Sequence, residues 1–250
     1  MKKIVIAEVA SNQEIASGIF KLCLNMPADY PDSEPGQFVN LYLNDASLLL
    51  PRPISICAYA EGRLTLVYAV VGEGTRMISG YGPGEKIRVS PPFGNGFVTD
   101  GAKQCLLVGG GVGTPPLLFL AKKLAADGGA DVRAVLGFQS QPFLTDEFPC
   151  DVHIATDDGS AGFKGSVVEL LAKTDIPAGT QMFACGPKPM LKALAQFASE
   201  RGIPWQVSLE EHMGCGFGAC VSCVCNTTGG VEKVCVNGPV LNGSEVIWDE

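Results

Sequence analysis

The stretch QCLLVGGGVGTPP, residues 104–116, runs from an apolar segment through a glycine-rich turn into two prolines. Residues 104–108 are typical of a buried strand. The prolines fit the first turn of a helix, where backbone N–H groups lack helical partners. Such a turn lets a dinucleotide pyrophosphate approach a helix N-terminus, where free N–H groups favour anions. The stretch predicts an α/β nucleotide-binding domain, although tight packing alone also uses glycine-rich turns.

Strands and helices alternate around this stretch through residues 101–205. The expected strands are 104–108, 132–138, 152–156 and 181–184, and the expected helices are 114–126, 167–173 and 189–200. This alternation is typical of a parallel sheet that binds ligands beyond the carboxyl ends of its strands. Two further turns, TDDGS at 156–160 and Cys185-Gly186-Pro187, end strands at that edge. Each alone is equally explained as a plain strand-to-helix connection.

Residues 1–100 show a different pattern, six short β-rich runs separated by Gly, Pro, Asn and Asp. The runs are 2–9, 18–26, 37–43, 52–59, 63–71 and 86–89, with one helical turn at 74–80. They predict an antiparallel barrel. The arginine of RPIS, residues 52–55, needs an anion or an exposed edge, because a strand interior does not solvate its charge. Gly74-Thr75 is either a cofactor contact or a helix cap.

Five of the ten cysteines lie in residues 206–250. Cys215, Cys220, Cys223 and Cys235 have the spacing C-x4-C-x2-C-x11-C, and the first three match plant-type 2Fe–2S proteins. The small residues of this loop leave room for N–H groups to point at the sulfur atoms. A structural zinc is the alternative, because C-x2-C is also half of a zinc site. Cys225 leaves a slipped ligand set open, but we interpret it as a spectator thiol.

The composition excludes several classes of protein. The chain has 250 residues, 46% hydrophobic and 18% charged, with a formal charge of −8. The negative charge argues against nucleic acid as the main partner, because binding to phosphates requires a basic face. The longest stretch that could be taken for a membrane span, 104–121, carries no charge but holds four glycines and two prolines, unlike such a span. We expect a cytoplasmic protein without a membrane segment, in which cysteines bind metal rather than form disulfides.

Together these motifs resemble the ferredoxin–NAD(P) reductase superfamily, in which a flavin-binding barrel with Arg-x-x-Ser precedes a nucleotide domain with a late Cys-Gly-Pro. The segment SLEEHMGCGFGAC, residues 208–220, resembles the electron-transfer subunits of NAD-dependent dihydroorotate dehydrogenases, and the resemblance covers essentially the whole chain. It implies an antiparallel FAD-binding β-barrel at 1–100. It also implies a parallel-sheet NAD-binding α/β domain at 101–205 and a 2Fe–2S domain at 206–250.

The resemblance also implies site residues, with Arg52 on the FAD pyrophosphate and Ser55 near the reactive edge of the flavin. Implied FAD contacts are Arg52, Pro53, Ile54, Ser55, Val67, Tyr68, Ala69, Gly74 and Thr75. Implied NAD contacts are Gly110, Gly111, Gly113, Thr114, Cys185 and Gly186, and implied cluster ligands are Cys215, Cys220, Cys223 and Cys235. No catalytic acid, base or nucleophile is expected on this chain. Ala69 and His212 depart from the family, which often has a basic residue at each position.

The implied function is electron transfer in pyrimidine biosynthesis. An FMN-containing dihydroorotate dehydrogenase catalytic subunit would supply electrons, which the 2Fe–2S cluster and FAD pass to NAD⁺, in a heterotetramer with two copies of each chain. Gln139-Ser140-Gln141 offers no cation for a 2′-phosphate and favours NAD over NADP. A FAD/2Fe–2S subunit of a sulfide dehydrogenase, hydrogenase or transhydrogenase remains open, as does a zinc-bearing binding module.

Overall fold

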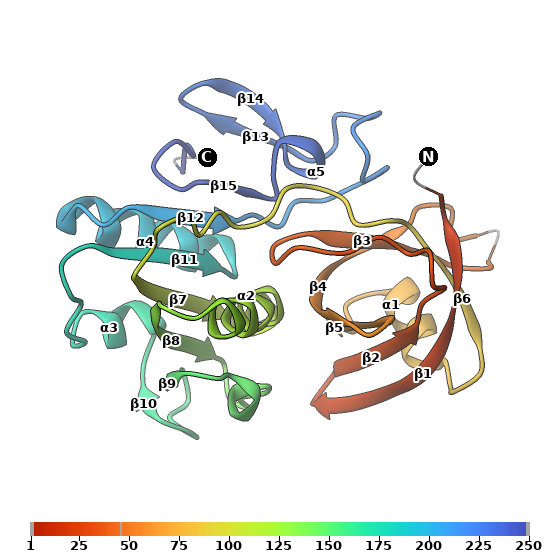
Figure 1. The fold of residues 1–250 in the computed structure, drawn as a ribbon, viewed down its shortest axis with the longest axis horizontal. Coiled ribbons are helices and arrows are strands. Elements are labelled where there is room, and N and C mark those ends of the chain that lie inside the picture. Colours follow the sequence, from red (N-terminus) through yellow and green to blue (C-terminus); the bar gives the residue numbers. More distant parts are fainter. Residues whose placement is uncertain (1–2, 46, 249–250) are drawn as a thin grey trace.

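A closed antiparallel barrel of six strands forms the first part of the chain (Figure 1). The computed structural model describes residues 3–45 and 47–248, so Lys2, where the first strand was expected to begin, lies outside them. The strands are β1 (Val5–Ala16), β2 (Ile19–Asn25), β3 (Phe38–Tyr42), β4 (Arg52–Ala60), β5 (Arg63–Ala69) and β6 (Lys86–Val89), closing in the order β1-β2-β5-β4-β3-β6. Alternate residues such as Leu22, Leu24, Leu64 and Leu66 fill the interior. The predicted antiparallel barrel is confirmed.

The first strand is longer than its sequence predicts. It continues to Ala16, whereas the apolar pattern ends at Val9. Residues 10–16 are mostly polar and half-buried, and pairing with β2 holds them in the sheet through two register shifts. Cross-strand pairing therefore extends a strand that local propensity alone does not reveal.

A second sheet of seven strands has the order β10-β9-β8-β7-β11-β12-β15. Its strands are β7 (Gln104–Gly110), β8 (Asp131–Phe138), β9 (Asp151–Thr156), β10 (Phe163–Lys164), β11 (Thr180–Cys185), β12 (Trp205–Ser208) and β15 (Val240–Asn242). All neighbouring strands pair in parallel except β15, which runs antiparallel to β12. The predicted parallel sheet is confirmed. Three of its strands, β10, β12 and β15, were not expected.

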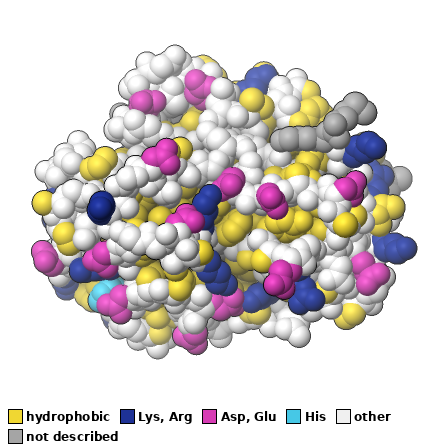
Figure 2. Space-filling model, in the orientation of Figure 1, with side chains coloured by type: hydrophobic (Ala, Val, Ile, Leu, Met, Phe, Trp, Pro, Cys, Tyr) yellow, Lys and Arg dark blue, Asp and Glu magenta, His cyan; other side chains and the backbone are white. Residues whose placement is uncertain are grey.

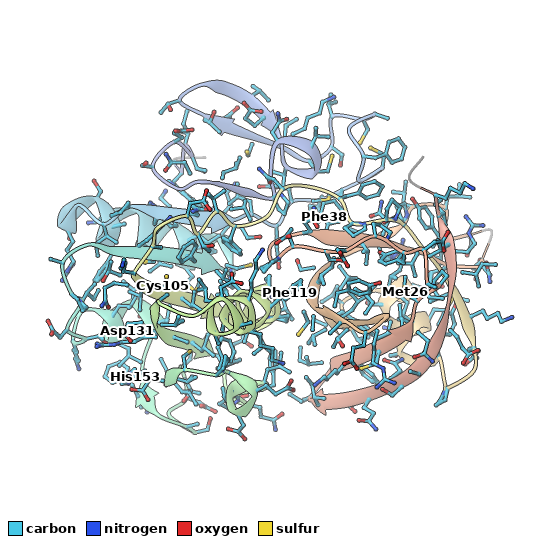
Figure 3. All side chains as sticks on the ribbon, in the orientation of Figure 1. Met26, Phe38, Cys105, Phe119, Asp131 and His153 are labelled. Carbon is cyan, nitrogen blue, oxygen red and sulfur yellow. The ribbon has the colours of Figure 1, made fainter. Side chains whose placement is uncertain are left out.

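Helices cover both faces of this sheet. Apolar residues of α2 (Thr114–Asp127) share one core with the barrel residues Cys57 and Val67, whereas α3 (Val167–Leu171) and α4 (Lys188–Arg201) pack on the other face. Phe119 of α2 packs against the barrel interior (Figure 3). The helix α2 therefore lies between the barrel and the sheet. None of the helices in the described part of the chain is long and apolar enough to cross a membrane.

The remaining elements are short. Helix α1 (Glu73–Ser79) follows β5, and the turns η1 (Gly111–Gly113) and η2 (Thr145–Glu147) lie in the α/β part. The C-terminal segment contains the hairpin β13 (Val224–Thr227) and β14 (Gly230–Lys233), then α5 (Val234–Asn237). Strand β12 spans the expected boundary at 205/206, and β15 from the C-terminal segment extends the sheet. The division of the chain into three domains stays a prediction.

Candidate functional site

A cavity of about 880 Å³ opens where β4 and β5 of the barrel face the C-terminal segment. Residues 48–51, Val112 of the glycine-rich turn and residues 209–213 form other parts of its wall. Of the residues expected to contact FAD, those in this wall are Arg52, Pro53, Ile54, Ser55, Val67, Tyr68, Ala69 and Thr75. The fold thus gathers three separate sequence motifs around one cavity, which we call cavity 1.

The side chain of Arg52 lies over the start of helix α1. A Cβ placed on Gly74 would stand 2.1 Å from Nε of Arg52, so the guanidinium rests directly on the glycine backbone. The guanidinium also donates to the carbonyl of Leu50, and Arg52 forms no ion pair with a carboxylate of the described residues. A cation without an acidic partner in a cavity wall suits an anionic group such as a pyrophosphate. Gly74, which does not line cavity 1 itself, makes room for this cation.

A second cavity of about 910 Å³, cavity 2, lies at the carboxyl edge of the parallel sheet. Gly110, Gly111, Gly113 and Gly186 line it, whereas Thr114 and Cys185 are fully buried behind its wall. The two nucleotide motifs touch each other, because a Cβ on Gly113 would lie 2.3 Å from the carbonyl oxygen of Cys185. The turns that end β7, β8, β9 and β11 therefore share one crevice, the usual ligand position in such sheets.

The two cavities meet at a shared wall. Ala69, Val71, Val112 and Glu210 line both of them. A ligand in cavity 1 and a ligand in cavity 2 can therefore approach each other across these four residues.

Glu210 is a candidate functional residue that the sequence analysis did not single out. Its side chain is exposed to the two cavities, and the protein packed around the carboxyl group desolvates it and raises its pKa. Burial also raises the pKa of the neighbouring Cys185 thiol, and the Glu210 charge raises it further. The position of Glu210 could have marked it as a site residue. It follows the buried strand β12 and Leu209, at the carboxyl edge of the sheet, where ligands usually bind.

The four expected cluster ligands lie close together as two pairs of thiols. The Sγ atoms of Cys215 and Cys220 are 3.4 Å apart, and the thiol of Cys223 hydrogen-bonds with Cys235. Burial alone would raise the pKa of Cys215, but the N–H groups of Cys220, Phe217 and Ala219 point at its sulfur and lower the pKa to about 6. The loop thus stabilises a thiolate, as the sequence analysis expects of a cluster-binding loop.

This arrangement fits a two-iron cluster better than a single zinc ion. Four thiolates hold a 2Fe–2S cluster, two on each iron. Cys225 lies in β13 and packs against the core of the sheet, to which Cys223 and Cys235 also belong. The donor set and its pairing therefore match the cofactor that the spacing predicts.

Comparisons with known proteins agree with this geometry. Residues 210–247 match the family model of the iron–sulfur cluster binding domain of dihydroorotate dehydrogenase B. The electron transfer subunit of dihydroorotate dehydrogenase B (NAD⁺) from Bacillus caldolyticus is 41% identical over 252 residues, covering 96% of each chain. The corresponding subunit from Caldanaerobacter subterraneus is 37% identical over 252 residues, covering 97% of this chain and 98% of the relative.

Solved structures share the fold over most of the chain. A chain of an NADH-dependent reduced ferredoxin-NADP oxidoreductase has a TM-score of 0.87 and 32% identity, covering 100% of this chain and 92% of that one. A ferredoxin NADP⁺ reductase from Neisseria gonorrhoeae, solved with bound FAD and NADP, has a TM-score of 0.68 at 17% identity, covering 81% and 93%. The second likeness concerns the fold alone. With relatives 41% identical over nearly its whole length, the chain belongs to the family of dihydroorotate dehydrogenase B electron transfer subunits.

Proposed function

We propose that the protein transfers electrons from an FMN-containing dihydroorotate dehydrogenase subunit to NAD⁺, and that it holds one FAD and one 2Fe–2S cluster. The observation that carries this proposal is the order of the three sites. Cavity 1 shares a wall with cavity 2 at Val112 and Glu210, and it is also lined by Met213, two residues before Cys215. Nucleotide site, flavin site and cluster site thus follow one another without a gap.

The side chains of this protein bind and orient the cofactors. FAD exchanges electrons in pairs with NAD and singly with an iron–sulfur centre, which is chemistry that the bound cofactors supply. Arg52 neutralises the FAD pyrophosphate, Ser55 lies beside the flavin, and residues 67–69 with Thr75 complete that wall. Gly110, Gly111, Gly113, Thr114, Cys185 and Gly186 shape the NAD site. Cys215, Cys220, Cys223 and Cys235 are the cluster ligands.

NAD is the proposed coenzyme. Neither Lys nor Arg occurs among the residues lining cavity 2, whereas Asp157 and Gln139-Ser140-Gln141 do. A carboxylate accepts hydrogen bonds from ribose hydroxyls and repels a 2′-phosphate. The lining therefore suits NAD better than NADP.

The proposal places the protein in the cytoplasm, because free cysteine ligands need a reducing compartment. It also includes a heterotetramer with two copies of each chain. It further divides the chain into an FAD barrel at 1–100, an NAD domain at 101–205 and a cluster domain at 206–250.

The proposed function is tested by the visible spectrum with iron and flavin analysis, followed by addition of dihydroorotate with and without the FMN subunit. Flavin and iron bands that dihydroorotate bleaches only with the FMN subunit support the proposal. A colourless protein containing zinc contradicts it.

A second candidate is a subunit of an NADH-dependent ferredoxin–NADP oxidoreductase. The 32% identity and the TM-score of 0.87 to a chain of such a complex favour it. Both candidates keep the proposed cofactors of this chain and differ in the partner. Bleaching by NADH without any response to dihydroorotate and the FMN subunit would favour this candidate.

Replacing Phe217 by Asp is expected to weaken binding of the FMN subunit by about tenfold or more, because a charge would enter an apolar contact. Phe217 is 56% exposed beside the cluster ligands, and Val221 and Val236 are exposed near it. Figure 2 shows hydrophobic side chains over this region, around α5 and the adjoining loop. Affinity measured by calorimetry or gel filtration checks the prediction. Ile6→Asp, at a 63% exposed barrel residue, is the control. Equal affinity of both variants would show that the partner docks elsewhere.

Replacing Glu210 by Gln is expected to stabilise the protein at neutral pH. Burial raises the pKa of Glu210, so the folded state favours the protonated carboxyl and stability falls as pH rises from the ordinary pKa through the raised one. The neutral amide does not carry this penalty. Thermal unfolding midpoints of variant and native protein should converge near about pH 4 and diverge toward pH 8. A difference that is constant with pH would contradict the burial of this charge.

A further inference from the structure

Asn40 of β3 connects the barrel directly to the first cluster ligand. Its side chain is fully buried, and its Nδ2 donates a hydrogen bond of 3.0 Å to the carbonyl oxygen of Cys215. The backbone of Asn40 is itself held by Ser90, whose Oγ accepts from Asn40 N at 2.9 Å and whose N–H donates to Asn40 O at 3.0 Å. The carboxamide is therefore anchored to the barrel and oriented toward the cluster loop.

The cluster loop is shaped to receive this carboxamide. Gly216 has a φ of +75°, and a Cβ at this position would stand 2.5 Å from Nδ2 and 2.8 Å from Oδ1 of Asn40. Only a glycine allows the amide to lie against the backbone here. Buried polar groups are costly unless they make hydrogen bonds, and Oδ1 of Asn40 has no partner. The bond to Cys215 is thus the one hydrogen bond that the Asn40 side chain makes among the described residues.

The strand that carries Asn40 also belongs to the wall of cavity 1. In the register of β3 with β4, Asn40 lies opposite Pro53 and Phe38 lies opposite Ser55. Phe38 lines cavity 1, and Figure 3 shows it on β3 below the C-terminal segment. Side chains two residues apart on a strand share a face. One pair of hydrogen-bonded strands therefore bears both the flavin wall and the contact with the cluster loop.

We infer that Asn40 is a positioning residue that holds the cluster loop at a set distance from the flavin site. The inference rests on the proposed function, because it assigns Asn40 a part in electron transfer between those two sites. Electron tunnelling falls steeply with distance, so a loop that moves away from the barrel slows the transfer without changing either cofactor.

The test uses the purified protein with its cofactors bound and the variants Asn40→Ala and Asn40→Asp. The aspartate keeps the shape of the side chain but has no proton to donate when it is ionised. Asn95→Ala is the matched control, because Nδ2 of Asn95 donates a similar bond of 2.9 Å to the carbonyl of Asn237, outside the cysteine loop. Hydrogen exchange of residues 214–220 and stopped-flow reduction by NADH are measured for each protein, with iron content.

Both Asn40 variants should exchange the amides of residues 214–220 about tenfold faster than the native protein, because a buried hydrogen bond contributes about that factor. NADH should reduce their flavin at the native rate and their cluster about tenfold more slowly, with iron content unchanged. Asn95→Ala should change none of these values. A merely structural role would instead lower cofactor content without this split between the two rates.

Native cluster reduction and exchange rates in both Asn40 variants would overturn the inference. If only Asn40→Ala loses iron, the rates measured for Asn40→Asp decide whether the inference holds. Loss of iron in both variants would also overturn the inference, because Asn40 would then be needed for cluster assembly. Failure of the proposed function gives a different result. In that case dihydroorotate with the FMN subunit would not reduce the native protein, whatever the Asn40 variants show with NADH.

Discussion

Cys220→Ser is expected to lose the 2Fe–2S cluster while keeping FAD and NADH-driven reduction of an artificial dye. The thiol of Cys220 lies 3.4 Å from that of Cys215, so its removal leaves one half of the ligand set with a single sulfur. Loss of a hydrogen-bond partner behind a ligand already costs about 10- to 100-fold in metal affinity, and loss of the ligand should cost more. The cavity walls do not include Cys220, so the flavin and nucleotide sites should remain.

Iron analysis and the EPR signal of the reduced protein check this result, together with NADH-dependent dye reduction. Cys225→Ser is the matched control, because Cys225 is a thiol of the same segment that is expected to be a spectator. It should retain its full complement of iron. Iron retained in Cys220→Ser, or lost in Cys225→Ser, would mean that the ligand set is wrong.

Gly74→Ala is expected to weaken FAD binding by about tenfold to hundredfold. The new Cβ would occupy the space of the Arg52 guanidinium, only 2.1 Å from its Nε, and push this cation out of place. A hydrogen bond to a charged group contributes about 1.5–3 kcal/mol, which sets the size of the expected loss. Arg52→Ala should have an effect of similar size, because both substitutions remove the same contact.

The control is Gly72→Ala, two residues earlier in the same turn. A Cβ on Gly72 meets no atom within 4 Å, and its φ of −165° is extended backbone that any residue adopts. Fluorescence titration of the FAD-free protein gives the dissociation constants. Native affinity in both Gly74→Ala and Arg52→Ala would disprove the role of Arg52, and equal losses in Gly72→Ala and Gly74→Ala would point to a general disturbance of the turn.

The sequence reveals much of the candidate site because several motifs are local. The glycine-rich turn joins consecutive elements, and the ligand spacing from Cys215 to Cys235 lies within one short segment. Residues 52–55 lie within a single strand, where the charge of Arg52 is enough to mark them. The barrel follows from short β-rich runs separated by turn residues, and the parallel sheet follows from strand–helix alternation. Both are also local properties.

Other features arise only where distant segments meet. Asn40 and Cys215 are 175 positions apart, and nothing near Asn40 indicates the hydrogen bond between them. Glu210 looks like an ordinary surface acid until the fold places it in the wall shared by cavities 1 and 2. Likewise β15 contains only three residues and becomes a strand because β12 pairs with it.

The sequence by itself determined the barrel, the parallel sheet, the glycine-rich turn and the spacing of the cysteines, because each depends on residues close together in the chain. The tertiary structure alone decided how the sites adjoin. The shared wall at Val112 and Glu210, the Arg52 contact with Gly74 and the bond from Asn40 to the cluster loop all join separate elements. Their geometry depends on packing between those elements, which no local pattern encodes.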